Sequence, residues 1–310
     1  MKKRPIEVLI AAVVLCTAGS GAIGSMTFSI SGSTILFATY NEVRITTAGH
    51  TQLIKPPVEV GANEGYFAYP SISPKGDLIA WGFAVDLHNE RKSYLARYAL
   101  GIYSLKESKW KTYGDFDDIG ATAFSPDGSK VAFVAKRGES KELLVLDEGS
   151  KSLTNAPNPG GIPTTASLGW SADNKRLVVE ILETGEHHKV VLIDLTSGSV
   201  KSLGEGHDPS WSPNGEWIAY FDPPRSKCII SRPDGTIIRT LTKVSQSWVS
   251  YRRFGPSGPV WSPDSKQLLL TEMKGDGDYM DVVLVELETE KSTTKGKNCL
   301  AVFGWATGDR

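Results

Sequence analysis

Two short segments contain residue types that could bind a metal ion. Residues Gly275–Asp281 hold three carboxylates, and calcium prefers clustered carboxylate oxygens. Their spacing does not match an EF-hand loop, so we interpret the segment as a solvated hairpin turn. Glu186–His188 contains two adjacent histidines, and adjacent residues on a strand point to opposite faces. This pair favours a hairpin tip over a metal site, and we expect three further loop acids to be solvated: Asp115, Asp117 and Asp118.

The elements that would position such residues follow from a repeated motif. Five segments share one pattern: Ser71–Trp81, Ala123–Phe133, Gly169–Val179, Ser210–Tyr220 and Val260–Leu270. Their serines, at intervals of 52, 46, 41 and 50 residues, are Ser73, Ser125, Ser171, Ser212 and Ser262. A degenerate sixth copy, Gly304–Gly308, lies at the C-terminus. Repeats of this length with strand-like patterning predict the blades of a β-propeller.

Each part of the motif predicts a local structure. In Ser-Pro-Asp-Gly, proline presets φ in a β-turn, aspartate bonds to nearby backbone, and glycine tolerates the exit from the turn. The short apolar run that follows predicts a strand buried on both faces. The aromatic residue before the serine is large enough to fill the gap between neighbouring sheets. We therefore expect packing between blades from Phe124, Trp170, Trp211, Trp261 and Trp305.

The strand count predicts an all-β protein with four strands per blade and no convincing amphipathic helix, although Asp86–Ala99 is ambiguous. Outer strands are predicted at Glu142–Leu146, Lys151–Thr154, Lys189–Asp194, Ser199–Leu203, Cys228–Ser231, Ile237–Leu241, Val282–Glu286 and Lys291–Thr294. The first blade lacks an inner strand, which Leu300–Trp305 can supply to Thr34–Tyr40, Val43–Thr47 and Gln52–Ile54. Joining them closes a ring of six blades and removes the open edge.

The motif Trp-Ser-Pro-Asp-Gly-x-x-Ile-Ala-Phe resembles the WD40-like (PD40) repeat of the TolB-type six-bladed propellers. The resemblance covers about residues 26–310 and leaves no room for the N-terminal α/β domain of the TolB translocation protein. It implies a free-standing binding module, since most members of the family bind partners. The same propeller also caps some serine peptidases, but the chain has no Gly-x-Ser-x-Gly nucleophile elbow.

The N-terminus has the pattern of an export signal. Lys2, Lys3 and Arg4 precede an apolar run over Val8–Ala18 and a small-residue stretch that ends at Gly24. We expect residues 1–24 to be a signal peptide and 25–310 a single propeller domain, exported to the periplasm, the cell envelope or the medium. A retained membrane tether through residues 5–23 is the alternative, and Cys16 leaves a lipoprotein as a further one.

Composition limits the function classes. Of the 310 residues, 40% are hydrophobic and 22% charged, which excludes a disordered chain or a protein with many membrane spans. The formal net charge of −1 provides no basic field, so we expect no nucleic-acid partner. Cys228 and Cys299 follow the predicted signal and could pair after export, and the sequence leaves this open.

Three long loops alternate around the predicted ring on one face: Lys55–Tyr69, Asn155–Ser167 and Lys243–Pro259. Long loops are often functional, and aromatic residues mixed with arginine resemble protein-binding hot spots. We therefore predict a partner-binding face from Trp248, Tyr251, Arg252, Arg253, Asn63, Glu64, Tyr66 and Tyr69. The alternative is that these aromatic side chains fold back and pack over the channel.

The alternative function is a lactonase-like or lyase-like propeller enzyme with a divalent ion at the channel. The predicted inner strands hold one carboxylate, Asp208, with His207 just before it, and one acid and one histidine make a poor metal cage. We therefore expect a monomeric, non-catalytic scaffold that needs no metal or cofactor and binds a protein, peptide or glycan.

Overall fold

The structure is a computed structural model that describes residues 10–15, 34–39, 42–47, 50–54, 70–86, 97–164, 166–185, 187–242, 258–273, 280–299 and 301–307. These residues form strands and turns, and none of them lies in a helix long and apolar enough to cross a membrane. The protein is all-β in this part of the chain, as the repeat predicts.

Five sheets contain four antiparallel strands each and follow one another along the chain. The first holds β5 (Ser71–Ile72), β6 (Leu78–Asp86), β7 (Arg97–Ser104) and β8 (Lys109–Phe116). The second holds β9 (Asp118–Phe124), β10 (Lys130–Arg137), β11 (Ser140–Asp147) and β12 (Ser152–Asn155). The third holds β13 (Leu168–Trp170), β14 (Arg176–Leu182), β15 (His188–Asp194) and β16 (Val200–Glu205). The last two hold β17 (His207–Trp211), β18 (Ile218–Phe221), β19 (Cys228–Ser231) and β20 (Ile237–Leu241), then β21 (Val260–Trp261), β22 (Gln267–Met273), β23 (Met280–Glu286) and β24 (Ser292–Cys299).

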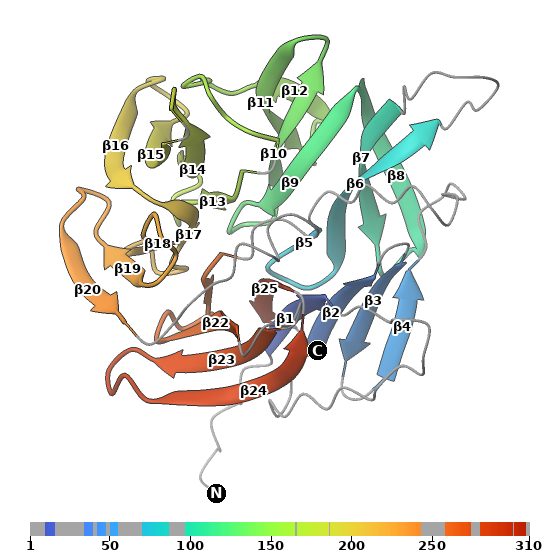
Figure 1. Cartoon of the computed structure of the whole chain (residues 1–310). Coiled ribbons are helices and arrows are strands. Elements are labelled where there is room, and N and C mark those ends of the chain that lie inside the picture. Colours follow the sequence, from blue (N-terminus) through green and yellow to red (C-terminus); the bar gives the residue numbers. More distant parts are fainter. Residues whose placement is uncertain are drawn as a thin grey trace, which may run out of the picture.

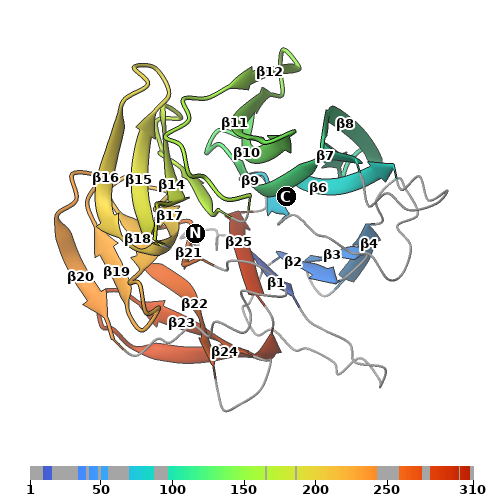
Figure 2. The same cartoon turned by 45° about the horizontal axis from the view of Figure 1, so that its top comes forward.

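The sheets are arranged in chain order around a common centre (Figure 1, Figure 2), as in a propeller. The first strand of each sheet, such as β9, β13 or β17, lies nearest the centre, and the last strand lies outside. In such a sheet the turn between the second and third strands and the exit from the fourth strand lie at the same end. These connections therefore share one face of the molecule, which we call the loop face.

A mixed sheet combines strands from both ends of the chain in the order β25-β1-β2-β3-β4. Its strands are β25 (Ala301–Thr307), β1 (Ile10–Leu15), β2 (Thr34–Thr39), β3 (Glu42–Thr47) and β4 (His50–Ile54). The C-terminal strand thus joins the N-terminal sheet, but β1 lies between them, antiparallel to β25 and parallel to β2. The sequence predicted four strands here and assigned residues 10–15 to the signal. The apolar run Ile10–Leu15 contains β-branched residues and can pair with the free edges of β25 and β2.

The turns of the repeated motif are held by the buried serine. The Ser125 hydroxyl donates to Oδ1 of Asp127 at 2.6 Å and accepts the backbone N–H of Lys130 at 2.9 Å. The other four motif serines are buried in the same way and make equivalent bonds. The turn also needs a residue with left-handed φ, which is glycine in three copies but Asn174 and Ser265 in the other two.

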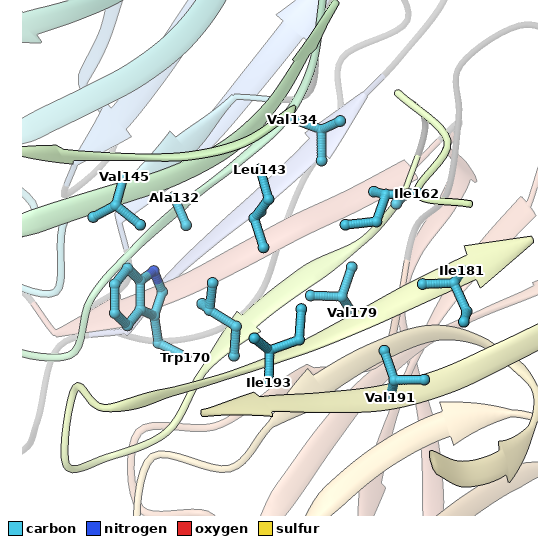
Figure 3. Packing of buried hydrophobic residues seen from close by; sticks show 12 residues of the cluster. Ala132, Val134, Leu143, Val145, Ile162, Trp170, Val179, Ile181, Val191 and Ile193 are labelled. Atoms are coloured by element: carbon cyan, nitrogen blue, oxygen red, sulfur yellow. The ribbon is translucent and has the colours of Figure 1, made fainter. Parts of the chain in front are cut away.

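The core lies between the sheets, and the motif tryptophans fill it as predicted. Trp170 is 5% exposed and packs against the neighbouring sheet, where Ala132, Leu143 and Val145 line the contact (Figure 3). Phe124, Trp211 and Trp261 occupy equivalent boundaries, with residues of the preceding sheet in each cluster. The Trp305 side chain lies outside the described side chains.

Two sequence-based details need correction. The three predicted loop acids lie mostly in strands: β8 extends to Phe116 and β9 begins at Asp118, so only Asp117 lies between them. The acids there are not simply solvated, since Arg97 forms ion pairs with both Asp115 and Asp117. Cys228 is a free buried thiol in β19.

Candidate functional site

The eight residues that the sequence predicts for partner binding lie outside the described residues: Asn63, Glu64, Tyr66, Tyr69, Trp248, Tyr251, Arg252 and Arg253. Most of the acidic turn Gly275–Asp281 does so as well. The described part of the chain instead brings together five ionisable side chains beneath the loop face. We call Glu180, His188, His207, Asp208 and Arg225 the buried polar cluster.

Glu180 is the centre of the buried polar cluster. Its Oε1 atom lies 2.6 Å from Nδ1 of His188 and 3.2 Å from Nδ1 of His207. Its Oε2 atom accepts the backbone N–H of Asp208 at 2.8 Å. Glu180 is fully buried, His207 is 2% exposed, and the side chain of His188 is 16% exposed. The two imidazole rings also contact each other, with centroids 4.2 Å apart.

Asp208 links Glu180 to an arginine. Its carboxylate forms an ion pair with Arg225, which is 2% exposed, and accepts the Ser167 hydroxyl at 3.2 Å. Burying two opposite charges is tolerated where they pair and are hydrogen-bonded. The ion pair between Asp208 and Arg225 thus holds Asp208 in place, and the backbone N–H of Asp208 orients the Glu180 carboxylate.

A bulge in β17 places His207 and Asp208 side by side in the site. The register of β17 with β18 shifts between His207 and Ser210. Asp208 has φ 51°, a left-handed conformation that costs a non-glycine residue about 1 kcal/mol or more. Pro209, which cannot donate to a sheet ladder, follows within the shifted segment. Bulges of this kind redirect side chains and are common beside functional sites.

The two carboxyl groups respond differently to burial. Burial raises the pKa of Glu180, but hydrogen bonds from His188, His207 and the Asp208 backbone outweigh this and hold it at about 2. Burial raises the pKa of Asp208 to about 6; Arg225 opposes this shift and the charge of Glu180 adds to it. The hydrogen bonds to Glu180 therefore favour its ionised form, whereas burial of Asp208 disfavours the ionised form and Arg225 opposes that effect.

Three members of the buried polar cluster were considered from the sequence. His207 and Asp208 were identified on the inner strand as a poor metal cage, and His188 was interpreted as part of a hairpin tip. Glu180 was missed because it lies on the second strand of its sheet and not on an inner strand. His187 and His188 do diverge as predicted: His187 is exposed, with its Nδ1 3.9 Å from Glu205, while His188 turns inward. The available signal was Glu180 itself, a charge in the apolar strand Leu177–Leu182, since buried charges require partners.

A pocket lies on the loop face, on the other side of β14. Its volume is about 420 Å³, and it is lined by Glu139, Ser140, Lys141, Asn158, Gly160, Gly161, Ile162, Pro163 and Leu182. The long loop Asn155–Ser167 forms one wall. The loop is tied down by a bond from the backbone N–H of Leu182 to the Gly161 carbonyl at 2.8 Å, and by Asn158 Nδ2 donating to the Lys141 carbonyl at 2.7 Å.

Comparisons with known proteins agree on the fold. No family model matches the chain. Over 92 residues the chain is 33% identical to the uncharacterized peptidase YuxL of Bacillus subtilis. This aligned segment covers 28% of this chain and 13% of that protein. TolB from Acinetobacter baumannii superposes with a TM-score of 0.64 at 19% identity, covering 86% of this chain and 62% of that one. A prolyl endopeptidase structure gives 0.56 at 15% identity, covering 93% and 42%.

The chain spans less than two thirds of each of these three proteins. Structural similarity at such low identity carries information on fold and none on activity, because one fold hosts many functions. The neighbours include peptidases as well as TolB, which agrees with a propeller used in different contexts. Together with the motif turns and the four-stranded sheets, they show that this chain has a TolB-like β-propeller fold.

Proposed function

We propose that the protein is an exported, non-catalytic scaffold with six blades closed by β25, and that it binds a protein partner through the long loops of the loop face. The observation that carries the proposal is the loop Asn155–Ser167, which follows β12. Hydrogen bonds hold it against the β10–β11 hairpin, through Asn158 and Lys141, and against β14, through Gly161 and Leu182. The loop forms one wall of the 420 Å³ pocket. A loop fixed in this way presents a preorganised surface, which lowers the entropic cost of binding.

The composition of this surface fits a protein partner. Ile162, Pro163 and Leu182 are apolar side chains of the pocket lining, and Leu182 is 37% exposed. Glu139 and Lys141 add one negative and one positive charge to the same lining. Protein interfaces combine apolar contacts with polar and charged groups. The other two long loops, which the sequence predicts on the same face, carry the aromatic and arginine residues predicted to be hot spots.

A crosslinking pull-down from native cell envelopes tests the proposal. The wild type is compared with a triple variant, Trp248→Ala, Arg252→Ala and Arg253→Ala, and with a pocket variant, Leu182→Asp with Lys141→Glu. The matched control changes two exposed lysines of the outer strand β8, Lys109→Ala with Lys111→Ala. We expect one protein to be captured by the wild type and the control but lost from the loop variant.

The melting temperature separates binding from folding in this experiment. Arg252→Ala with Arg253→Ala should weaken capture and leave the melting temperature unchanged. Capture that persists in both loop-face variants, or a large melting shift with intact capture, would contradict the proposal.

A further inference from the structure

The buried polar cluster contains a donor set that divalent transition metals bind. One potential ligand atom from each of Glu180, His188 and His207 lies within 4.8 Å of the other two. Bonds of about 2.0–2.2 Å to a tetrahedral ion such as Zn²⁺ need ligand atoms about 3.3–3.5 Å apart. The Glu180 oxygen lies 2.6 and 3.2 Å from the two nitrogens, so each of these two distances is within about 1 Å of the required spacing.

The propeller fold itself does not require these side chains. Counting from the motif serine, the position of Glu180 is occupied in the other four copies by Gly82, Val134, Phe221 and Thr271. The position of His207 is occupied by small residues in the other copies: Ala68, Gly120, Ala166 and Ser257. In a repeat protein, shared positions serve the shared fold. A fully buried glutamate and a buried histidine at two such positions therefore point to a local role.

Surrounding groups orient the ligands as in known metal sites. The backbone N–H of Asp208 occupies Oε2 of Glu180 at 2.8 Å, which leaves Oε1 facing the two imidazoles. Asp208 is in turn held by Arg225 and Ser167. Metal-binding carboxylates and histidines are typically held by such outer hydrogen bonds. The bulge at Asp208 is the backbone device that produces this arrangement.

The charges of the cluster are compatible with a bound cation. Asp208 pairs with Arg225, and Glu180 brings a negative charge to the two imidazoles and accepts the Asp208 N–H. A cation between these three side chains would pair with the Glu180 carboxylate directly. The partly exposed His188, at the start of β15, gives an ion a route from the loop face.

We propose that Glu180, His188 and His207 bind one divalent transition-metal ion, with Zn²⁺ as the best match, between the third and fourth of the four-stranded sheets. Two ligands come from β14 and β15 and the third from β17, so the ion would link neighbouring blades. Three protein ligands leave a fourth position for water. The proposal is independent of partner binding, and each can fail without the other.

Metal titration tests this site directly. The chain is purified without a polyhistidine tag, stripped with a chelator and titrated with Co²⁺, whose visible absorption reports coordination, and with Zn²⁺ by calorimetry. We expect one equivalent to bind to the wild type and the affinity to fall at least tenfold in His188→Ala. His187→Ala is the matched control, since His187 is adjacent but 64% exposed and outside the cluster. Its affinity should equal that of the wild type.

Thermal unfolding with and without Zn²⁺ provides a second readout. Glu180→Gln and His207→Ala alter fully buried positions and could prevent folding, so the test relies on His188→Ala at the edge of the cluster. Zn²⁺ should raise the melting temperature of the wild type and of His187→Ala equally, and raise that of His188→Ala clearly less at the same Zn²⁺ concentration. Absence of stoichiometric binding to the wild type, or equal loss in both histidine variants, would overturn the proposal and leave a purely hydrogen-bonded cluster.

Discussion

Nε1 of Trp170 donates a hydrogen bond to the carbonyl oxygen of Ala123 at 3.0 Å, across the boundary between two sheets. The same indole is 5% exposed and packs against apolar side chains of both sheets. One side chain of the repeated motif thus provides both apolar packing and a specific polar contact between blades. Trp261 repeats this contact with the carbonyl oxygen of Ser210 at 3.3 Å.

Replacing Trp170 should separate these two contributions. Trp170→Ala creates a large cavity and should lower the free energy of unfolding by about 3–5 kcal/mol. Trp170→Phe keeps most of the packing. It should lower the free energy of unfolding by about 1 kcal/mol through the lost hydrogen bond and by a smaller amount through the reduced packing. Urea unfolding measures both, with Ile237→Ala, 57% exposed, as the control expected to change stability little. Equal losses in the two tryptophan variants would contradict this division.

Gly120 should tolerate no larger residue. A Cβ atom there would lie 1.6 Å from the carbonyl oxygen of Thr164, which belongs to the loop Asn155–Ser167. Gly120→Ala must therefore displace the Asn155–Ser167 loop, and we expect a loss of about 1–3 kcal/mol from overpacking. Limited proteolysis should cut the loop faster than in the wild type. Gly138→Ala, where nothing lies within 4 Å but φ is 58°, serves as the control for backbone strain alone. Unchanged cleavage and stability in Gly120→Ala would contradict the close approach.

The two chain ends should differ in importance. If residues 1–24 are a cleaved signal, the exported protein begins near Ser25, and a chain of residues 25–310 should unfold with the same midpoint as the isolated exported protein. Removing residues 301–310 deletes β25 and should prevent cooperative unfolding, because the edge of β1 or β2 is then exposed. Mass spectrometry of exported protein gives the N-terminus. Exported protein that retains residues 1–24 would contradict cleavage; Ile10–Leu15 would then be present either as β1 of the sheet or as part of a tether, but not as both.

Cys228 should resist alkylation in the folded protein. Its thiol is fully buried, and burial raises its pKa well above the usual range, so almost no thiolate exists at pH 8. Unfolding lowers the pKa to its ordinary value and exposes the sulfur. Peptide mass spectrometry after iodoacetamide treatment should show labelling of Cys228 in urea but little in buffer. Rapid labelling in buffer would show that β19 opens locally, and a disulfide to Cys299 would appear as a linked peptide.

Much of the fold could be read from the repeat. The strands Cys228–Ser231 and Ile237–Leu241 have the predicted bounds, and the described motif tryptophans pack between sheets as predicted. These features depend on residues close in sequence, since a Ser-Pro-Asp-Gly turn and an apolar run specify a hairpin locally. The prediction that Asp115 and Asp118 lie in a loop was less accurate, because pairing with neighbouring strands extends β8 and β9 up to either side of Asp117.

The blades, their spacing and the residues that pack between them follow from the amino-acid sequence, because each blade repeats one local pattern. The contacts of Glu180 with His188, eight residues away, and with His207, 27 residues away in the next blade, are visible only in the folded protein. That meeting depends on how one sheet lies against the next and on a bulge that turns Asp208 into a left-handed conformation. Neither follows from local propensity, since both arise from the packing of segments distant in the chain.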